Sequence, residues 1–525
     1  MTRPIRQTRA LLGTATAMAL ALGTAAQAQT LQVVMESRLS VLDPTMSTSH
    51  QTRNHGYMIY DTLLAIDADG EIRPQMADWE VSEDGTAYTF TLREGMTFHD
   101  GAPVTAADAV ASIHRWAQSD RMARALMPHI TDIRAENELS FVIEMDFATD
   151  LILSAFAKQS GLPLFVLPAR LAETEAGTAI EEHIGSGPFR FNAAEFQPGV
   201  RVIYDRFDEY VPRDEPASGL AGGKVVHVAR MERIEMADEL TKINTLLGGE
   251  IDILETVPFD LLPMVQGNAD VIVDIRDTIG LASFYRFNQI NAPFDDPVIR
   301  QAAMYAMGQE PALRAQIGDP TYYNTCAAVF GCGMPYEFDT HAEMVIEANP
   351  ERAAELLSEA GYDGETVMIL QATDIPMIQS IPIVMAQQLR AAGFTVEVQS
   401  MDFMTLLSRR SNRGPVEDGG WSIFVTTWHN VEVEDPIRSF VVTANGADAW
   451  AGWPDVPELV ALVDEYLVTG DADERYELAR QIHDMTLEQG VSVPFGHVVK
   501  PTGRRANIDG ILETPVPVFW NVTKG

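Results

Sequence analysis

Two apolar segments, Thr366-Val-Met-Ile-Leu-Gln-Ala372 and Phe394-Thr-Val-Glu-Val-Gln399, flank a stretch with a different pattern. Each segment has the length of a β-strand. Residues 379–392 between them have a helical pattern, and Gly393 follows where a left-handed C-terminal cap is expected. The order strand, helix, strand predicts a βαβ crossover, which makes its two strands parallel. We therefore expect a chain of the α/β class.

A third strand is predicted at Trp421-Ser-Ile-Phe-Val-Thr-Thr-Trp428. In open α/β sheets, ligands bind beyond the carboxyl ends of the strands. This rule selects the segments 373–377, 401–403 and 428–435 as candidate binding segments. A strand expected at 31–35 likewise delivers Glu36 to a strand end. Two lobes whose strand ends face one another would form a cleft.

Length and charge limit the classes of protein to consider. At about 150 residues per domain, 525 residues correspond to roughly three domains or lobes. Hydrophobic residues make up 46% of the chain and charged residues 21%, which is ordinary globular composition. The 37 Lys and Arg are outnumbered by 75 Asp and Glu, so the net charge is −38. This charge argues against nucleic-acid partners and disfavours binding to anionic lipid, because both would repel the chain.

The N-terminus has the pattern of an export signal. Three arginines, Arg3, Arg6 and Arg9, precede the apolar run 10–21, and Ala26-Gln-Ala28 fits a cleavage site. We interpret residues 1–28 as a secretory signal peptide that leaves a soluble periplasmic protein starting at Gln29. The alternative is an apolar N-terminal helix. The only two cysteines, Cys326 and Cys332, are expected to form a small-loop disulfide in the oxidising periplasm, with two free buried thiols as the alternative.

Motifs that carry enzyme chemistry are missing from the sequence. There is no phosphate-binding loop of the G-x-x-x-x-G-K-[ST] type, no G-x-S-x-G nucleophile turn and no H-E-x-x-H zinc motif. The acidic cluster of Glu432, Glu434 and Asp435 lacks the spacing of a calcium loop. We therefore expect neither an enzyme nor a bound metal or cofactor. Because the chain has 75 Asp and Glu, a pair of catalytic carboxylates keeps a secreted hydrolase as an alternative.

One long motif resembles a known family. It is Pro74-Gln-Met-Ala-Asp-Trp-Glu-Val-Ser-Glu-Asp-Gly-Thr-Ala-Tyr-Thr-Phe-Thr-Leu-Arg-Glu-Gly-Met-Thr-Phe-His-Asp-Gly101, continuing to Asp108. It resembles the signature of the dipeptide, oligopeptide and nickel family of extracellular solute-binding proteins (family 5), which serve ABC importers. Further matches follow in the family's order at 185–189, 247–252, 287–302 and 353–362. The resemblance spans nearly the whole chain after the signal peptide.

The resemblance implies a fold, a division of the chain and a partner. The expected fold is a two-lobed α/β fold of the periplasmic-binding-protein type (type II), with an extra subdomain and a ligand cleft between the lobes. Lobe I would comprise residues 29–60, 184–280 and 485–525, the extra subdomain 61–183, and lobe II 281–484. The lobes would close on the ligand by a hinge motion, and the closed form would be read by the permease subunits in the inner membrane. We expect a monomer.

The same resemblance points to the end of the third strand as a binding site. In the family's oligopeptide binders, a Trp at the position of Trp428 stacks on the ligand, and an Asp three residues later holds the peptide's α-amino group. Here that later position is Val431. Either Glu432 takes the role of the amine anchor, or the anchor is absent.

The candidate ligand-binding residues come from the strand-end rule and the resemblance together. They are Trp428, His429, Asp435, Glu432, Phe403, Tyr57 and Glu36. The alternatives are core packing for Trp428, a structural hydrogen bond for His429, a helix cap for Asp435, and core packing or a solvated edge for Phe403, Tyr57 and Glu36.

The predicted function is capture of a peptide or a polar solute of similar size for an ABC importer. A second hypothesis keeps the same role with a non-peptide ligand: an opine, an oligosaccharide, an aromatic compound or a metal chelate. A secreted hydrolase is the hypothesis from a different class.

Overall fold

Two large sheets organise the chain in the computed structural model, which describes residues 29–175 and 177–525. The predicted signal peptide, residues 1–28, lies outside the described residues. Within the described ranges, no helix combines the length and the apolar character that crossing a membrane requires.

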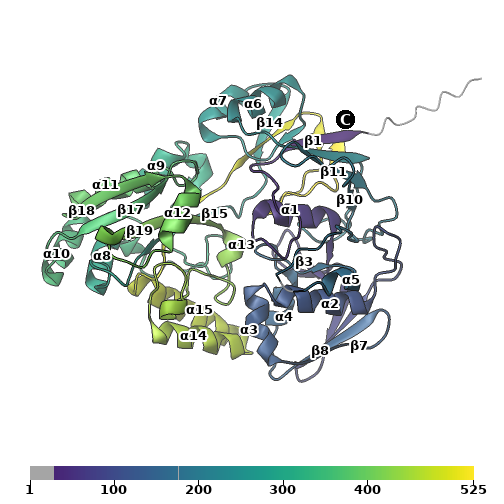
Figure 1. The fold of residues 1–525 in the computed structure, drawn as a ribbon, viewed down its shortest axis with the longest axis horizontal. Helices are drawn as coiled ribbons and strands as arrows, with labels where there is room; N and C mark the ends of the chain where they lie inside the picture. The colour runs from purple at the N-terminus through teal and green to yellow at the C-terminus, as the bar shows by residue number, and fades with distance from the viewer. Residues whose placement is uncertain (1–28, 176) are drawn as a thin grey trace, which may run out of the picture.

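A seven-stranded sheet forms the core of the first lobe (Figure 1). Its strand order is β10 (Phe189–Phe191), β11 (Arg201–Arg206), β12 (Arg230–Ile234), β1 (Thr30–Val34), β13 (Ile253–Leu254), β21 (Pro501–Arg505) and β14 (Val271–Ile275). The central strand β1 pairs in parallel with β12 and β13, so that β1 delivers Glu36 to the edge where these strands end. Three helices belong to this lobe: α1 (His50–Ile59), α6 (Glu239–Gly248) and α7 (Leu262–Val265).

A six-stranded sheet forms the core of the second lobe. Its order is β16 (Tyr323–Asn324), β20 (Val493–Val498), β15 (Leu281–Phe287), β19 (Ile423–His429), β17 (Thr366–Ala372) and β18 (Thr395–Met401). Strands β17 and β18 run parallel, with helix α11 (Ile381–Ala391) between them in the sequence, so the predicted βαβ crossover is confirmed. The other helices of this lobe are α8 (Pro297–Ala306), α9 (Gln309–Gln316), α10 (Pro350–Ala360), α12 (Phe403–Arg410), α13 (Asn430–Val433), α14 (Pro457–Val468) and α15 (Ala472–Glu488).

The extra subdomain has its own four-stranded antiparallel sheet. The order is β5 (Ala77–Val81), β6 (Ala87–Leu92), β8 (Ser140–Met145) and β7 (Ile130–Ala135). Helices α2 (Ala106–Ala117), α3 (Arg121–Leu126), α4 (Leu151–Ala157) and α5 (Ala169–Ala172) accompany it. Small two-stranded sheets join β2 (Asp61–Thr62) to β9 (Phe165–Val166), β3 (Leu64–Ile66) to β4 (Ile72–Pro74), and β22 (Ile508–Asp509) to β23 (Thr523–Lys524).

Two short segments connect the lobes. Residues 276–280 lead from β14 of the first sheet to β15 of the second, and residues 499–500 lead back from β20 to β21. The return crossing therefore follows Val498, whereas the division of the sequence placed the end of lobe II at residue 484, inside α15. Strand β20 pairs with β15, which is why it belongs with the second lobe. Helix α13 lies on the side of this lobe that faces α1 (Figure 1).

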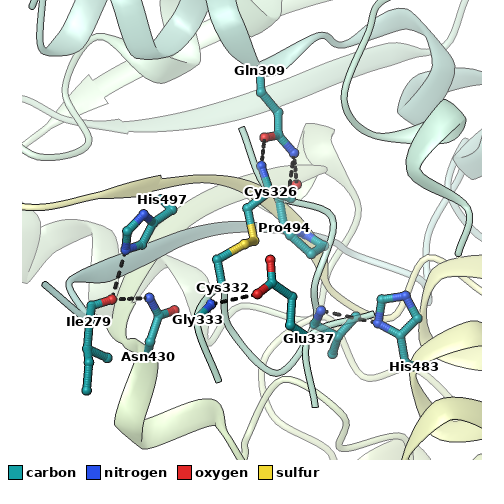
Figure 2. Close-up of a disulfide and its surroundings, with 11 residues drawn as sticks. Ile279, Gln309, Cys326, Cys332, Gly333, Glu337, Asn430, His483, Pro494 and His497 are labelled. Atoms are coloured by element: carbon teal, nitrogen blue, oxygen red, sulfur yellow. Dashed lines mark hydrogen bonds between the residues drawn. A yellow bond between two sulfur atoms is a disulfide. The ribbon is translucent and has the colours of Figure 1, made fainter. Parts of the chain in front are cut away.

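A disulfide joins Cys326 and Cys332 and closes a loop beside α13 (Figure 2). Gln309 supports the loop at Cys326, because its side chain accepts from the Cys326 N–H at 2.8 Å and donates to the Cys326 carbonyl at 2.7 Å. Gly331 has a φ of +90°, and a Cβ atom there would lie 2.7 Å from Asn430 Oδ1. The closed loop thus packs directly against the first residue of α13.

Candidate functional site

The carboxyl end of β19 brings three of the predicted residues into one short turn. Trp428 and His429 end the strand, and Glu432 lies in the single turn of α13 that follows. The turn is closed in both directions, because Glu432 Oε2 accepts from the His429 N–H at 3.1 Å and His429 Nδ1 accepts from the Val431 N–H at 3.4 Å. This capping arrangement fixes the direction of both side chains relative to the strand.

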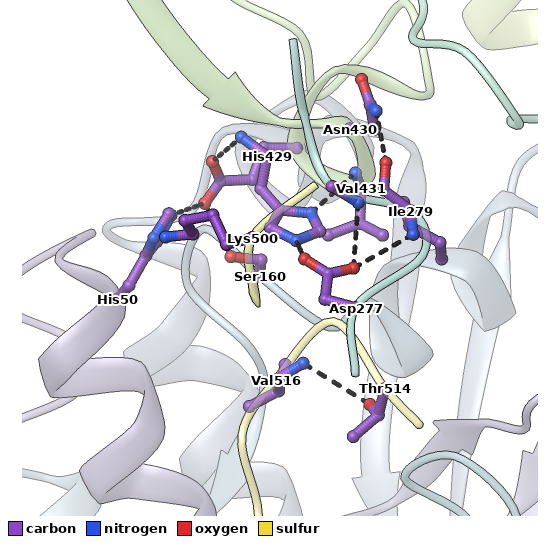
Figure 3. A network of polar contacts seen from close by, with 12 residues as sticks. His50, Ser160, Asp277, Ile279, His429, Asn430, Val431, Lys500, Thr514 and Val516 are labelled. Carbon is purple, nitrogen blue, oxygen red and sulfur yellow. Dashed lines mark hydrogen bonds and ion pairs between the residues drawn. The ribbon is translucent and has the colours of Figure 1, made fainter. Parts of the chain in front are cut away.

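Glu432 connects the second lobe to the first. Figure 3 labels two of its partners, His50 and Ser160. Its Oε1 accepts from Ser160 Oγ at 2.6 Å and lies 3.1 Å from His50 Nε2. Burial opposes ionisation of this carboxyl, but the charge and hydrogen bond of His50, the Ser160 hydroxyl and the nearby Arg53 outweigh it and hold the pKa well below its usual range. The carboxylate is therefore ionised at neutral pH, and both of its oxygens are already engaged.

His429 ties the same turn to the first crossing segment. Its Nε2 lies 2.6 Å from Asp277 Oδ2, and Asp277 Oδ1 accepts from the N–H groups of Ile279 and Gly280. Burial by itself would raise the pKa of Asp277. The charge of His429 and these hydrogen bonds outweigh burial and lower the pKa to about 2. The result is a polar link between strand β19 and residues 276–280.

The second crossing segment is held by a different ion pair. Lys500 Nζ donates to Glu36 Oε2 at 2.6 Å, two residues beyond the end of β1. Burial disfavours both charges, but their mutual attraction lowers the pKa of Glu36 and raises that of Lys500. Each of the two segments that connect the lobes thus makes a charged contact: residues 276–280 through Asp277 and residues 499–500 through Lys500.

Two cavities flank the contact between Glu432 and His50. The first has about 790 Å³ of space not filled by protein atoms, including space open to solvent. Six of the residues described above line it: Glu36, His50, Arg53, Asp277, His429 and Lys500. The second has about 540 Å³, and its walls come from Thr48 of the first lobe, from the extra subdomain (within 119–124 and 158–162) and from the second lobe (within 428–440). Trp428 and Glu432 line this second cavity.

Trp428 presents an aromatic wall to the second cavity. It stacks on Phe440, with ring centroids 5.8 Å apart and an angle of 24° between the planes, and meets Trp450 edge to face. Such faces suit apolar or planar parts of a ligand. Trp428 and Trp450 both pack against the core of the second lobe.

The other three predicted residues lie away from both cavities. Asp435 caps the following turn by accepting from the Ile437 N–H at 2.7 Å, and it also accepts from Tyr466 Oη at 2.8 Å. Tyr57 is only 2% exposed and packs edge to face on Phe165. Phe403 is half-buried against the core at the start of α12. Asp435 thus caps a turn, and Tyr57 and Phe403 pack against the core.

Several charged residues of the cleft were not identified from the sequence. Arg53 lies one helical turn after His50 on α1, and Arg121 and Arg124 have the same spacing on α3. This spacing places the members of each pair on one face of a helix and is the signal that could have drawn attention to them. Asp277 and Lys500 offered no such signal, because their position depends on where the chain crosses between the sheets.

Across residues 29–175 and 177–525, no group of three or more His, Cys, Asp or Glu side chains is arranged to hold a metal ion.

Comparison with known proteins agrees with this architecture. The profile of a family described as bacterial extracellular solute-binding proteins, family 5 (middle region), matches residues 71–448. A probable peptide ABC transporter periplasmic-binding protein, y4tO, from Sinorhizobium fredii is 37% identical over 94% of this chain and 93% of its own length.

Two solved structures share the fold. The dipeptide-binding protein from Pseudoalteromonas sp. SM9913, in complex with Met-Leu, has a TM-score of 0.76 at 20% identity and covers 95% of this chain and 100% of its own. The binding protein AgaA from A. tumefaciens R10, in complex with agropinic acid, has a TM-score of 0.75 at 22% identity and covers 95% and 99%. From the profile match and the extent of similarity to y4tO, the chain belongs to the family 5 bacterial extracellular solute-binding proteins.

Proposed function

We propose that this protein captures a peptide or a polar solute of similar size in the periplasm and delivers it to the permease subunits of an ABC importer. The observation that carries the proposal is the pair of cavities at the contact between the lobes. Glu36 and His429 line the first cavity, and Trp428 and Glu432 line the second. Every wall combines residues from distant parts of the chain, as expected for a cleft that closes on its ligand. The name of the 37% identical relative supports a peptide-class solute.

The cleft is built for binding, and we propose that the solute leaves it chemically unchanged. The acid and base groups nearest one another are joined in structural pairs, Glu36 with Lys500 and Asp277 with His429. A general base must have a free lone pair within reach of the proton it removes, and both oxygens of Asp277 already contact His429 or accept from the Ile279 and Gly280 N–H groups. Mass spectrometry of the recovered ligand after incubation should find its mass unaltered.

Thermal-shift screening of the purified mature protein tests the binding role. Binding to the folded state raises the melting temperature by mass action, so a di- or tripeptide library, opines, oligosaccharides, aromatic acids and a nickel–histidine chelate can be compared directly. We expect a peptide or another carboxyl-containing solute to raise it. The proposal fails if no solute of any class does so, or if the ligand is converted.

The Trp428→Ala variant locates the site. Loss of a buried aromatic contact at the centre of an interface should weaken binding of the identified solute about tenfold or more. The matched control is Tyr476→Ala, which removes a 47% exposed aromatic side chain from α15 of the same lobe. Unchanged affinity in Trp428→Ala would place the solute elsewhere.

We further propose a monomer that begins at Gln29, which size-exclusion chromatography and mass determination of the exported protein will check.

A further inference from the structure

The second cavity is positively charged although the whole chain is strongly acidic. Its lining holds two carboxylates, Asp120 and Glu432, and four basic side chains: Arg121, Arg124, Lys158 and Arg438. The chain as a whole carries a net charge of −38. Basic side chains therefore outnumber acidic ones in the lining of this cavity, although acidic residues outnumber basic ones in the chain as a whole.

Both carboxylates of the cavity are already used by the protein. Asp120 forms an ion pair with Lys158, in which each side chain is 4% exposed, and its other oxygen accepts from the Ala123 N–H at 2.9 Å. Glu432 accepts from Ser160 and the His429 N–H and contacts His50. Neither group has the free, exposed oxygens that an incoming ammonium group would require.

The basic groups are not balanced in the same way. Among the described residues, Arg121 and Arg124 have no carboxylate within ion-pair distance. Arg121 donates from Nε to the Ile437 carbonyl at 2.8 Å and lies over the Phe440 ring at 5.2 Å. Burial lowers its pKa to about 10, which still leaves it charged at neutral pH.

Unused hydrogen-bond donors are found in the same walls. In the part of the chain that the structure describes, Trp428 Nε1 and Arg438 Nε are buried without a partner. Buried donors normally have an acceptor, so this side of the cavity has a surplus of donors over acceptors. The positive charge and the unused donors of the second cavity therefore both favour a ligand group that is anionic and accepts hydrogen bonds.

We infer that the solute enters the second cavity with a carboxylate group between Arg121, Arg124 and the Trp428 side, and not with a free amine. A carboxylate would satisfy the unpaired guanidinium groups with charge-assisted hydrogen bonds, whereas an ammonium group would meet like charge. The faces of Trp428 and Phe440 suit an apolar or planar part next to that carboxylate. The ligand class is thus an anionic solute of peptide size, such as an acidic peptide or an opine. This inference rests on the proposed solute-binding function.

Calorimetric titration with two matched tripeptides tests the inference. N-acetyl-Glu-Phe-Glu has a blocked amine and three carboxylates, whereas Lys-Phe-Lys-amide has free amines and no carboxylate. We expect the acidic peptide to bind at least about tenfold more tightly, and its affinity to fall with added salt. The double variant Arg121→Gln/Arg124→Gln should lose about tenfold of that affinity, because two charges that face the ligand are removed.

Arg352→Gln is the control, since Arg352 is an exposed arginine on α10 that pairs with Glu355. It should leave the affinity unchanged. Tighter binding of the basic peptide, or equal affinity of the double variant for the acidic one, would overturn the inference. If a neutral or basic solute binds and depends on Trp428, the inference fails and the proposed function stands. If no solute in the wider screen binds, both fail together.

Discussion

The two cavities differ in how their charges are paired. The lining of the first holds three carboxylates and three Lys or Arg side chains, and its main pairs, Lys500 with Glu36 and Asp277 with His429, involve the segments that connect the lobes. The lining of the second has twice as many basic groups as carboxylates. Charges around the first cavity hold the crossing segments in place, whereas two of those around the second, Arg121 and Arg124, have no carboxylate partner among the described residues and are available to a solute. Four changes test this division, in order of expected size.

The largest effect is expected for the buried pair of Lys158 and Asp120. Lys158→Met leaves Asp120 as an uncompensated buried carboxylate and should lower the free energy of unfolding by about 3–5 kcal/mol, measured by urea denaturation. Lys500→Met is the comparison at the first cavity, where the Lys500 and Glu36 side chains are 20% and 39% exposed. It should cost about 1 kcal/mol or less. Equal losses of unfolding free energy in Lys158→Met and Lys500→Met would show that the difference in burial does not make one ion pair more important for stability than the other.

Acid titration examines the link between Asp277 and His429. The folded-state pKa of Asp277, about 2, lies below the usual 3.9 or so of an aspartate. Its stabilisation is therefore fully present above pH 4 or so and is lost as the pH falls toward about 2, a total of about 2 kcal/mol. Asp277→Asn should lose that amount at neutral pH and show a flatter decline of the unfolding free energy below about pH 4. Asp132→Asn serves as control, because Asp132 forms a surface pair with Arg134 in which the side chains are 45% and 43% exposed. An equal change in this variant would contradict the assignment.

The disulfide loop packs against Asn430, which follows Trp428 of the second cavity and His429 of the first in the sequence. Replacing Cys326 and Cys332 by Ser should lower the free energy of unfolding by about 2 kcal/mol, because a short closed loop is released in the unfolded chain. Since Gly331 packs on Asn430, affinity for the identified ligand should fall as well. The same two quantities, the free energy of unfolding and the ligand affinity, should be measured on wild-type protein treated with a reductant for comparison with the double Ser variant. A stability loss without any change in affinity would separate the loop from α13.

The smallest change concerns the closure of the lobes. Glu432→Gln weakens the contacts with His50 and Ser160, and a loss of about 1 kcal/mol would shift the population toward open forms and weaken binding roughly fivefold. Small-angle scattering should then show a larger radius of gyration in the absence of ligand. Glu434→Gln is the control for scattering, because Glu434 pairs with Arg438 of the same lobe. A radius equal to that of wild type would indicate that Glu432 does not hold the lobes together.

Local patterns identified the scaffold well. The apolar run of β17 is largely buried and the helix that follows it has a defined end, so strand, helix and strand could be predicted from neighbouring residues alone. The end of β19 could be predicted as a site for the same reason, and Trp428, His429 and Glu432 do meet there. Asp435, Tyr57 and Phe403 are equally polar or aromatic in the sequence, yet they pack within one lobe.

The sequence was sufficient for the α/β class, the family resemblance and the strand end at which to look, because these depend on periodicity and on motifs of contiguous residues. Only the tertiary structure decided which charges are paired. Glu432 meets Ser160 across 272 positions of the chain, and Lys500 meets Glu36 across 464. A carboxylate's partners depend on how two lobes come together in space, and no local pattern encodes that distance.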